Sequence, residues 1–298
     1  MKKVLNLAMV FAMTAFFVAC SDSENEPTTG NLTVDLTGLE ELGSDFVYEG
    51  WLIVNGNPVS TGTFTSVTFP QTYSVDISNL QSATKFVLSI EPAVDSDPAP
   101  AATKILAGDF LGNSAAVNSN NIVVDATGDI KALENSLGKY ILATPTDSDD
   151  TNEASGVWFL DNSNASGAIA GLSLPTLSAG WKYEGWVVLG GTPVSTGTFT
   201  SAIGADDNAA TSPFKGALGN GPGFPGEDYL IGSAAGVDFP TDLKGATIVI
   251  SVEPSPDNSA APFTLKPLAH MVPANADNHT VITMGAGPLA VLSGSVTR

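Results

Sequence analysis

Few side chains of this sequence combine the residue types that catalysis or metal binding needs. The only histidines are His270 and His279, and the only cysteine is Cys20, so no His/Cys zinc spacing exists. Glu91 and Glu253 each stand alone before a proline. This placement favours a carboxylate that bonds to backbone or solvent over a catalytic acid pair. We therefore expect no enzyme activity, no cofactor, no catalytic residue and no metal site.

An acidic segment, residues 147–153, carries oxygen ligands of the kind that Ca²⁺ prefers, but it lacks the glycine and the spacing of an EF-hand. It lies within residues 144–155, a polar stretch with no aromatic residue. Clusters of this composition are typical of connections between folded segments. We expect a solvated linker at 144–155 rather than a calcium site.

Cys20 has a clear candidate chemistry, which is lipidation. Lys2 and Lys3 precede an apolar run over 4–18, and Ala19 and Cys20 follow it. The run is too short for a membrane span, and the order of charged, apolar and small residues is typical of a signal peptide. We expect a lipoprotein signal peptide at 1–19 and acyl chains on Cys20, which anchor a protein without spanning the membrane.

The anchor predicts an outer membrane lipoprotein that faces either the periplasm or the cell surface. Residues 20–30 form an acidic tether. The acidic cluster within it resembles the export signal of surface lipoproteins in Bacteroidetes, and a plain solvated tether is the alternative. The formal net charge of −20 at pH 7 repels phosphate backbones, so nucleic acid is not an expected partner. The expected partners are the membrane, through the lipid, and an unknown protein or glycan ligand.

Two copies of one sequence unit make up most of the chain. The segment Tyr48–Ser66 recurs at Tyr183–Ser201 with 14 of 19 positions identical, and Phe86–Pro92 recurs at Ile248–Pro254. The offset changes from 135 to 162 between the two matches. The second copy therefore contains an insertion, which we place within about 204–232.

The copied segments read as strands, because β-branched and aromatic runs alternate with glycine, proline, asparagine and aspartate. Asn55-Gly56 between two such runs predicts a tight hairpin, and Gly190-Gly191 stands at the same point of the second copy. No long segment after the signal peptide has helical periodicity. We predict an all-β chain of two tandem antiparallel β-sandwich (Ig-like) domains. The first repeat covers 31–143 and the second covers 156–298. The expected strands are 31–36, 47–54, 59–65, 84–91, 103–107, 121–125, 139–143, 157–161, 168–173, 181–189, 193–200, 246–253, 263–269, 279–284 and 288–296.

Matched aromatic residues are the first candidates for ligand binding. Trp51 and Trp186 lie three residues after a matched tyrosine, so one ring of each pair should point outward unless a bulge intervenes near Gly50 and Gly185. An outward ring is a platform for a sugar or a peptide. The alternative is that all of these aromatic side chains belong to the core.

The inserted loop supplies the remaining candidates, Phe214, Phe224 and Tyr229, in a frame rich in glycine and proline. Loops carry binding residues more often than cores do. A ligand-binding loop is therefore one hypothesis. The other is that these rings fold back over an open sheet edge.

The repeated pattern resembles the extracytoplasmic C-terminal domain of anti-sigma-K factors. The pattern is Tyr-x-x-Trp, then Pro-Val-Ser-x-Gly-x-Phe, then a strand that ends in Glu-Pro with a further proline beyond it. Its residues in the first copy are Tyr48, Trp51, Pro58, Val59, Ser60, Gly62, Phe64, Glu91, Pro92 and Pro100, and in the second copy Tyr183, Trp186, Pro193, Val194, Ser195, Gly197, Phe199, Glu253, Pro254 and Pro262.

The resemblance implies a β module in the cell envelope. Family members place a helical sigma-binding domain and a transmembrane helix before this module, and neither is recognised in this sequence. Direct capture of a sigma factor is therefore not expected. The expected function is a non-catalytic envelope lipoprotein that binds or senses, with a possible part in sigma-factor signalling. A surface glycan-binding or adhesive lipoprotein is the alternative.

Overall fold

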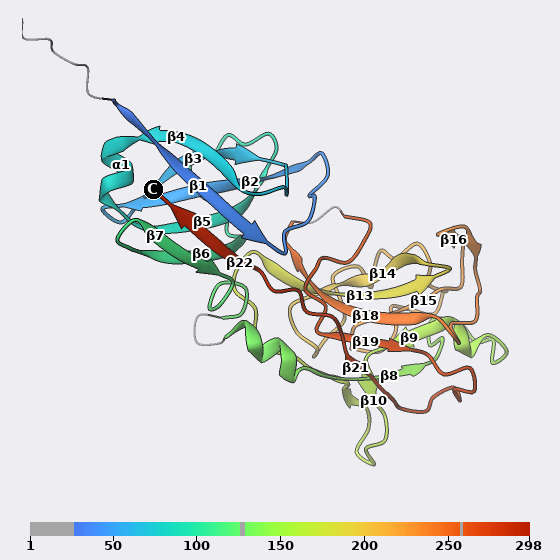
Figure 1. Cartoon of the computed structure of the whole chain (residues 1–298). Coiled ribbons are helices and arrows are strands. Elements are labelled where there is room, and N and C mark those ends of the chain that lie inside the picture. Colours follow the sequence, from blue (N-terminus) through green and yellow to red (C-terminus); the bar gives the residue numbers. More distant parts are fainter. Residues whose placement is uncertain (1–26, 126–128, 257–258) are drawn as a thin grey trace, which may run out of the picture.

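The computed structural model describes residues 27–125, 129–256 and 259–298. Their regular secondary structure is almost entirely antiparallel strand (Figure 1), which confirms the expected all-β class. The predicted signal peptide, Cys20 and most of the tether lie outside the described residues. Within the described part of the chain, no helix has the length and apolarity that a membrane crossing requires.

The first unit is a single eight-stranded sheet in the order β3-β2-β5-β6-β7-β22-β1-β4. The sheet curls until its two edges approach each other, so that the ring of Phe64 on β3 lies 5.9 Å from that of Tyr73 on β4. The curled sheet packs hydrophobic side chains on its inner face. Its strands are β1 (Thr29–Thr37), β2 (Phe46–Val54), β3 (Asn57–Phe64), β4 (Gln71–Asp76), β5 (Ala83–Pro92), β6 (Lys104–Leu111), β7 (Ser114–Asn118) and β22 (Ser293–Thr297).

A short helix, α1 (Ile77–Ser82), follows β4. It begins at Asp76, whose carboxylate accepts hydrogen bonds from the backbone N–H groups of Ser78 and Asn79, as is usual for an N-cap. Leu80 of α1 is buried and packs against Gly30 of β1.

The second unit has two main sheets, β14-β13-β18-β19-β21 and β12-β8-β9-β15, and β20 also pairs with β8. Phe159 packs against Gly185 of β13, where any side chain would collide with its ring. The strands are β8 (Leu137–Leu142), β9 (Gly156–Trp158), β10 (Leu160–Asp161), β11 (Ile169–Ala170), β12 (Leu172–Ser173), β13 (Trp181–Leu189), β14 (Thr192–Phe199), β15 (Gly226–Asp228), β16 (Ser233–Ala234), β17 (Val237–Asp238), β18 (Thr247–Pro254), β19 (Leu268–Met271), β20 (Ile282–Thr283) and β21 (Gly285–Ala286). Two 3₁₀ turns precede β8 and β9, η1 (Ile130–Asn135) before β8 and η2 (Glu153–Ser155) before β9.

The copied segment forms the same hairpin in both units. Asn55 and Gly56 turn between β2 and β3 with φ of 51° and 82°, which fits the two-residue turn that Asn-Gly predicts. Gly190 and Gly191 turn between β13 and β14 with φ of 59° and 91°. The register shifts between Gly50 and Trp51 on β2, and between Gly185 and Trp186 on β13. The expected bulge is therefore present in each copy.

Strand pairing crosses the expected repeat boundaries at two places. Strand β8, within the expected first repeat of 31–143, pairs with β9, β12 and β20 in the second unit. Strand β22, at the end of the expected second repeat of 156–298, lies between β7 and β1 in the first unit. In Figure 1 the dark red β22 accordingly runs beside the blue β1. The second unit is thus inserted between two neighbouring strands of the first.

The two units share one core. A single cluster of buried hydrophobic residues runs through both. Polar contacts join them as well, because the indole N–H of Trp181 donates to the carbonyl of Lys104 at 3.1 Å, and the hydroxyl of Thr103 donates to the carbonyl of Gly180 at 3.0 Å. The segment expected as a linker, 144–155, is folded against the second unit, where Thr146 is fully buried.

Candidate functional site

Both units contain the same buried chain of polar side chains beside the bulge. The indole N–H of Trp51 donates to the hydroxyl of Ser89 at 2.8 Å, and that hydroxyl donates to Glu91. Glu91 then accepts the backbone N–H of Ala101 with both carboxylate oxygens, at 2.9 and 3.0 Å. Burial raises the pKa of Glu91 because the charged form loses its water.

The second unit repeats this arrangement. Trp186 donates to Ser251 at 2.8 Å, Ser251 donates to Glu253, and Glu253 accepts the N–H of Phe263 at 2.9 and 3.1 Å. In both units the glutamate ties the loop after the Glu-Pro strand to the sheet. The two carboxylates therefore serve the fold, as the sequence favoured.

The candidate ligand platform at Trp51 and Trp186 is corrected by the structure. The two residues are only 4% and 2% exposed, so a ligand cannot stack on their rings. Tyr48 and Trp51 would point to opposite faces of a regular strand, but the bulge between them turns both side chains inward, and both are buried.

The inserted loop places Tyr229 in the core as well. Tyr229 is fully buried, and its hydroxyl donates to the carbonyls of Val194 and Ser195 on the edge strand β14. Its ring lies 5.9 Å from that of Phe214 and 5.2 Å from that of Phe239. Tyr229 is therefore removed from the candidate ligand-binding residues, because it covers a sheet edge.

Phe214 and Phe224 are half-buried. Phe214 also packs edge-on against Phe239, at 5.2 Å between ring centroids. Phe224 packs on a small separate cluster around Trp158 and Ile141. Both rings thus belong to the packing of the loop on the second unit, and a role for them in binding stays a prediction.

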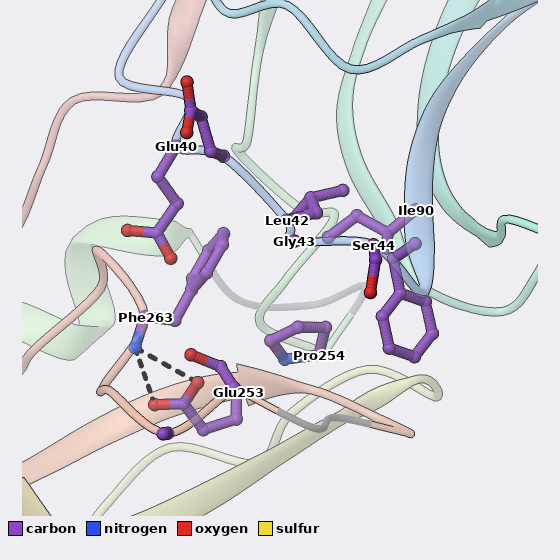
Figure 2. Close-up of a pocket in the computed structure, with 12 residues that line it drawn as sticks. Glu40, Leu42, Gly43, Ser44, Ile90, Glu253, Pro254 and Phe263 are labelled. Atoms are coloured by element: carbon purple, nitrogen blue, oxygen red, sulfur yellow. Dashed lines mark hydrogen bonds between the residues drawn. The ribbon is translucent and has the colours of Figure 1, made fainter.

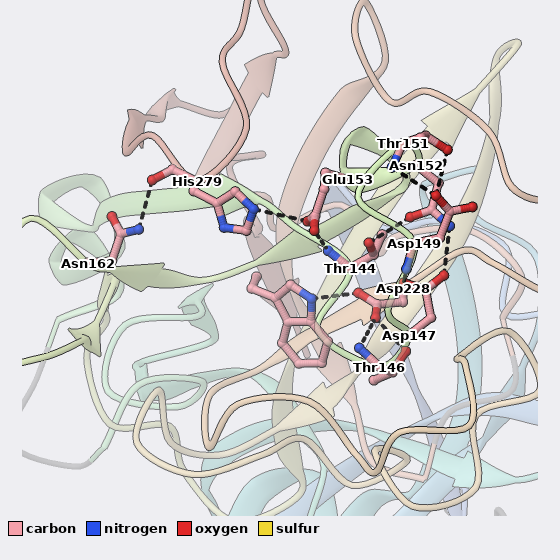
Figure 3. Close-up of polar contacts among 11 residues, drawn as sticks. Thr144, Thr146, Asp147, Asp149, Thr151, Asn152, Glu153, Asn162, Asp228 and His279 are labelled. Carbon is pink, nitrogen blue, oxygen red and sulfur yellow. Dashed lines mark hydrogen bonds and ion pairs between the residues drawn. The ribbon is translucent and has the colours of Figure 1, made fainter.

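The same loop buries three carboxylates. Asp228 is fully buried and is satisfied by the backbone N–H and the hydroxyl of Thr146 and by the indole N–H of Trp158, at 2.9 Å and 2.7 Å for the two N–H groups (Figure 3). Asp206 and Glu227 are only 7% and 3% exposed. None of the ion pairs in the described residues involves these three groups.

Asp206 and Glu227 are buried with no cation paired to them in the described residues, and this burial raises their pKa values. It raises the pKa of Asp206 to about 6 and that of Glu227 to about 7. Oδ2 of Asp206 accepts the N–H of Gly226 at 3.0 Å. Oδ1 is buried and makes no hydrogen bond within the described residues. A carboxylate in this position favours a bound proton.

The acidic segment 147–153 uses its oxygens for its own turn (Figure 3). Asp147 accepts from the side chain of Asn152 at 2.7 Å, and Asp149 accepts from the backbone N–H and the hydroxyl of Thr151 at 2.9 and 2.6 Å. His279, in a left-handed turn with φ of 59°, lies 3.1 Å from Glu153. In the described parts of the chain, no group of three or more His, Cys, Asp or Glu side chains is arranged to hold a metal ion.

A cavity of about 350 Å³ lies between the units (Figure 2). One wall is the loop over residues 40–46 before β2, and the other is formed by Glu253, Pro254 and Phe263. Tyr48 holds the loop by donating its hydroxyl to the carbonyl of Glu40 at 2.8 Å. The volume is at the lower end for a small-molecule site. The carboxylate of Glu253 in this wall already accepts the backbone N–H of Phe263.

The fold and these contacts define a class: an all-β protein of two related units whose buried acids and aromatic rings hold loops in place. Residues 22–106 match the family model described as the C-terminal region of the anti-sigma-K factor rskA. The match covers the first copy from the tether into β6, including its Tyr-x-x-Trp and Glu-Pro positions. It suggests an anti-sigma-factor-like regulatory role for the first unit. No significant match was found among curated proteins or among solved structures.

Proposed function

We propose that this protein is a non-catalytic lipoprotein of the bacterial cell envelope that binds or senses outside the cytoplasm through modules similar to the C-terminal region of anti-sigma-K factors. The family match over residues 22–106 carries the proposal. The buried Trp–Ser–Glu chain supports an equivalent second module, because it recurs in full at Trp186, Ser251 and Glu253. The module acts on sigma-factor signalling through a partner rather than by capturing a sigma factor directly.

Anchoring through Cys20 is the first part to test. In cells fed a palmitate analogue, the wild-type protein should carry the label and sediment with outer membranes. Cys20→Ala should lose the label and leave the membrane fraction, since the acyl chains supply the membrane affinity. Ser21→Ala is the matched control and should behave as wild type. Label that persists on Cys20→Ala would reject the anchor.

The regulatory part is tested by transcript profiling in a deletion strain. Loss of the protein should change a discrete set of genes that share a promoter element, and the wild-type gene should restore them. An unchanged transcriptome would argue against a regulatory role. Specific, saturable binding on a glycan array would instead support the glycan-binding alternative. That alternative would have to use a partly exposed ring, because every Phe, Tyr and Trp side chain in the described residues is buried or half-buried.

A further inference from the structure

The first unit is completed by the last strand of the chain. β22 pairs antiparallel with β1 on one side, from Thr33↔Thr297 to Thr37↔Ser293, and with β7 on the other, from Ser114↔Thr297 to Asn118↔Ser293. Between β7 and β22 the chain builds the whole second unit. Without β22, the backbone groups of two neighbouring strands would lose their partners, and such an edge readily takes up another strand.

In the second unit, β8 occupies the position that β22 occupies in the first unit. Leu36 and Thr37 of β1 pair with Gly294 and Ser293 of β22. Leu172 and Ser173 of β12 pair in the same way with Gly138 and Leu137 of β8. Tyr140 of β8 and Val296 of β22, each two residues after the glycine, are both fully buried. β8 and β22 are therefore equivalent strands.

Each of these strands leaves the unit that precedes it in sequence. β8 follows the first unit and completes the second. β22 follows the second unit and completes the first. If β22 followed the pattern of β8, it would pair in whichever unit comes after the second unit. Within one molecule, β22 returns to the first unit and pairs there with β1 and β7.

We propose that β22 is a transferable strand, and that the slot between β7 and β1 accepts β22 of a second copy of this chain. The donor strand and the acceptor slot are different surfaces, so the contact is head-to-tail and can extend to open chains of copies. Main-chain hydrogen bonds supply the binding, as in other cases of strand addition to a sheet edge.

Side chains make the slot specific for this sequence. Gly294 passes so close to the backbone of Asp35 and Leu36 that a side chain there would collide. Arg298 closes the end of the slot: its guanidinium donates to the carbonyls of Leu80, Ala83 and Gly112, at 2.7 Å for Ala83 and 3.0 Å for Gly112. It also lies over the ring of Phe110, 4.3 Å from the centroid. Any strand in the slot must match this register.

Paired cysteines can detect exchange. Asp35 and Ser295 are directly opposite and both exposed. In a Cys20→Ser background, Asp35→Cys and a size-tagged Ser295→Cys protein are refolded together at about millimolar concentration, the order of the effective concentration of a short tether. After mild oxidation we expect a covalent mixed dimer. The double variant should crosslink within one chain and prevent exchange.

A Ser74→Cys partner is the matched control. Ser74 is exposed on β4, on the other side of β1, and pairs with Asn31. Mixed dimers of Ser295→Cys with Asp35→Cys that do not exceed those with Ser74→Cys would overturn the proposal.

A shortened connection supplies an independent test. Deleting residues 289–291 removes about 10 Å of reach between the second unit and β22, and we expect this to keep β22 out of its own slot. Light scattering should show dimers and longer species in place of monomer, and a peptide of residues 287–298 should cap the chains and lower their mass. A folded monomer would contradict the proposal. If the variant fails to fold, the cysteine experiment decides alone.

Discussion

Ser89 and Ser251 occupy the middle of the two Trp–Ser–Glu chains, where each accepts from an indole and donates to a carboxylate. Replacing either serine by alanine leaves a buried indole N–H without a partner, which costs about 1–3 kcal/mol. We expect Ser89→Ala and Ser251→Ala each to lower the free energy of unfolding by about that amount in urea titrations. The exposed Ser74→Ala is the control and should change it by less than about 0.5 kcal/mol.

Glu227 predicts a pH-dependent stability. Its pKa is about 7 in the folded protein against 4.5 for a glutamate in water, so the folded state holds the proton more tightly than the unfolded state. The stabilisation by this proton is complete below about pH 4.5 and is lost as the pH rises through 7. Glu227→Gln keeps a neutral group that can accept the N–H of Asp228. The variant should therefore be more stable than wild type above pH 7, by on the order of 2 kcal/mol, and similar to it at pH 4.

Thermal unfolding of both proteins from pH 4 to pH 8 checks this expectation. The exposed Glu41→Gln should track the wild type across the range. Asp206, whose charge also raises the pKa of Glu227, titrates together with it, so Asp206→Asn should give a change of the same sign. A wild type that gains stability between pH 5 and pH 7 relative to Glu227→Gln would contradict the assignment.

The elements that sequence reasoning found are those with strong local signals. The hairpins at Asn55-Gly56 and Gly190-Gly191 depend on residues that tolerate positive φ, and both form. The strand expected at 121–125 is instead an isolated bridge at Val124, while β4, α1 and β7 were not expected. These segments are short and weakly patterned, and tertiary pairing decides their structure.

The inserted loop was open to two readings, and its contacts support the structural one. Replacing 206–227 with a short Gly-Ser linker removes Phe214 from its cluster with Tyr229 and Phe239 and removes the buried Asp206. We expect stability to fall by several kcal/mol, as for other losses of buried aromatic contacts. Replacing the exposed Leu218 by serine should leave the melting temperature nearly unchanged. A loop replacement that melts like the wild type would restore the ligand-binding hypothesis.

At the scale of the whole molecule, the repeat identified two related units but not which strands complete them. Sequence identity locates the copies, such as Tyr48–Ser66 and Tyr183–Ser201. It contains no information on the partner of a strand outside the copied segment. β8 and β22 share little more than Gly138 and Gly294, so a boundary placed between 143 and 156 assigns each strand to the unit that precedes it. The pairing assigns both to the other unit.

This exchange predicts the behaviour of a nicked molecule. Residues 148–151 are exposed, and exposed polar loops are preferred sites of proteolysis. A cut there leaves β8 on the N-terminal fragment, paired in the second unit, and β22 on the C-terminal fragment, paired in the first unit. Each fragment therefore holds a strand that the other needs. The nicked protein should elute as one species in gel filtration and should separate only in denaturant.

Truncation of residues 293–298 is the matched variant for this experiment. It removes one of the two exchanged strands and exposes the edges of β7 and β1, so the nicked, truncated protein should dissociate at a lower urea concentration than the nicked full chain. Two β-rich fragments that part under native conditions would instead describe independent tandem domains. One-species elution of the nicked full chain, together with easier dissociation of the truncated one, would show that the strands exchanged between the units hold the molecule together.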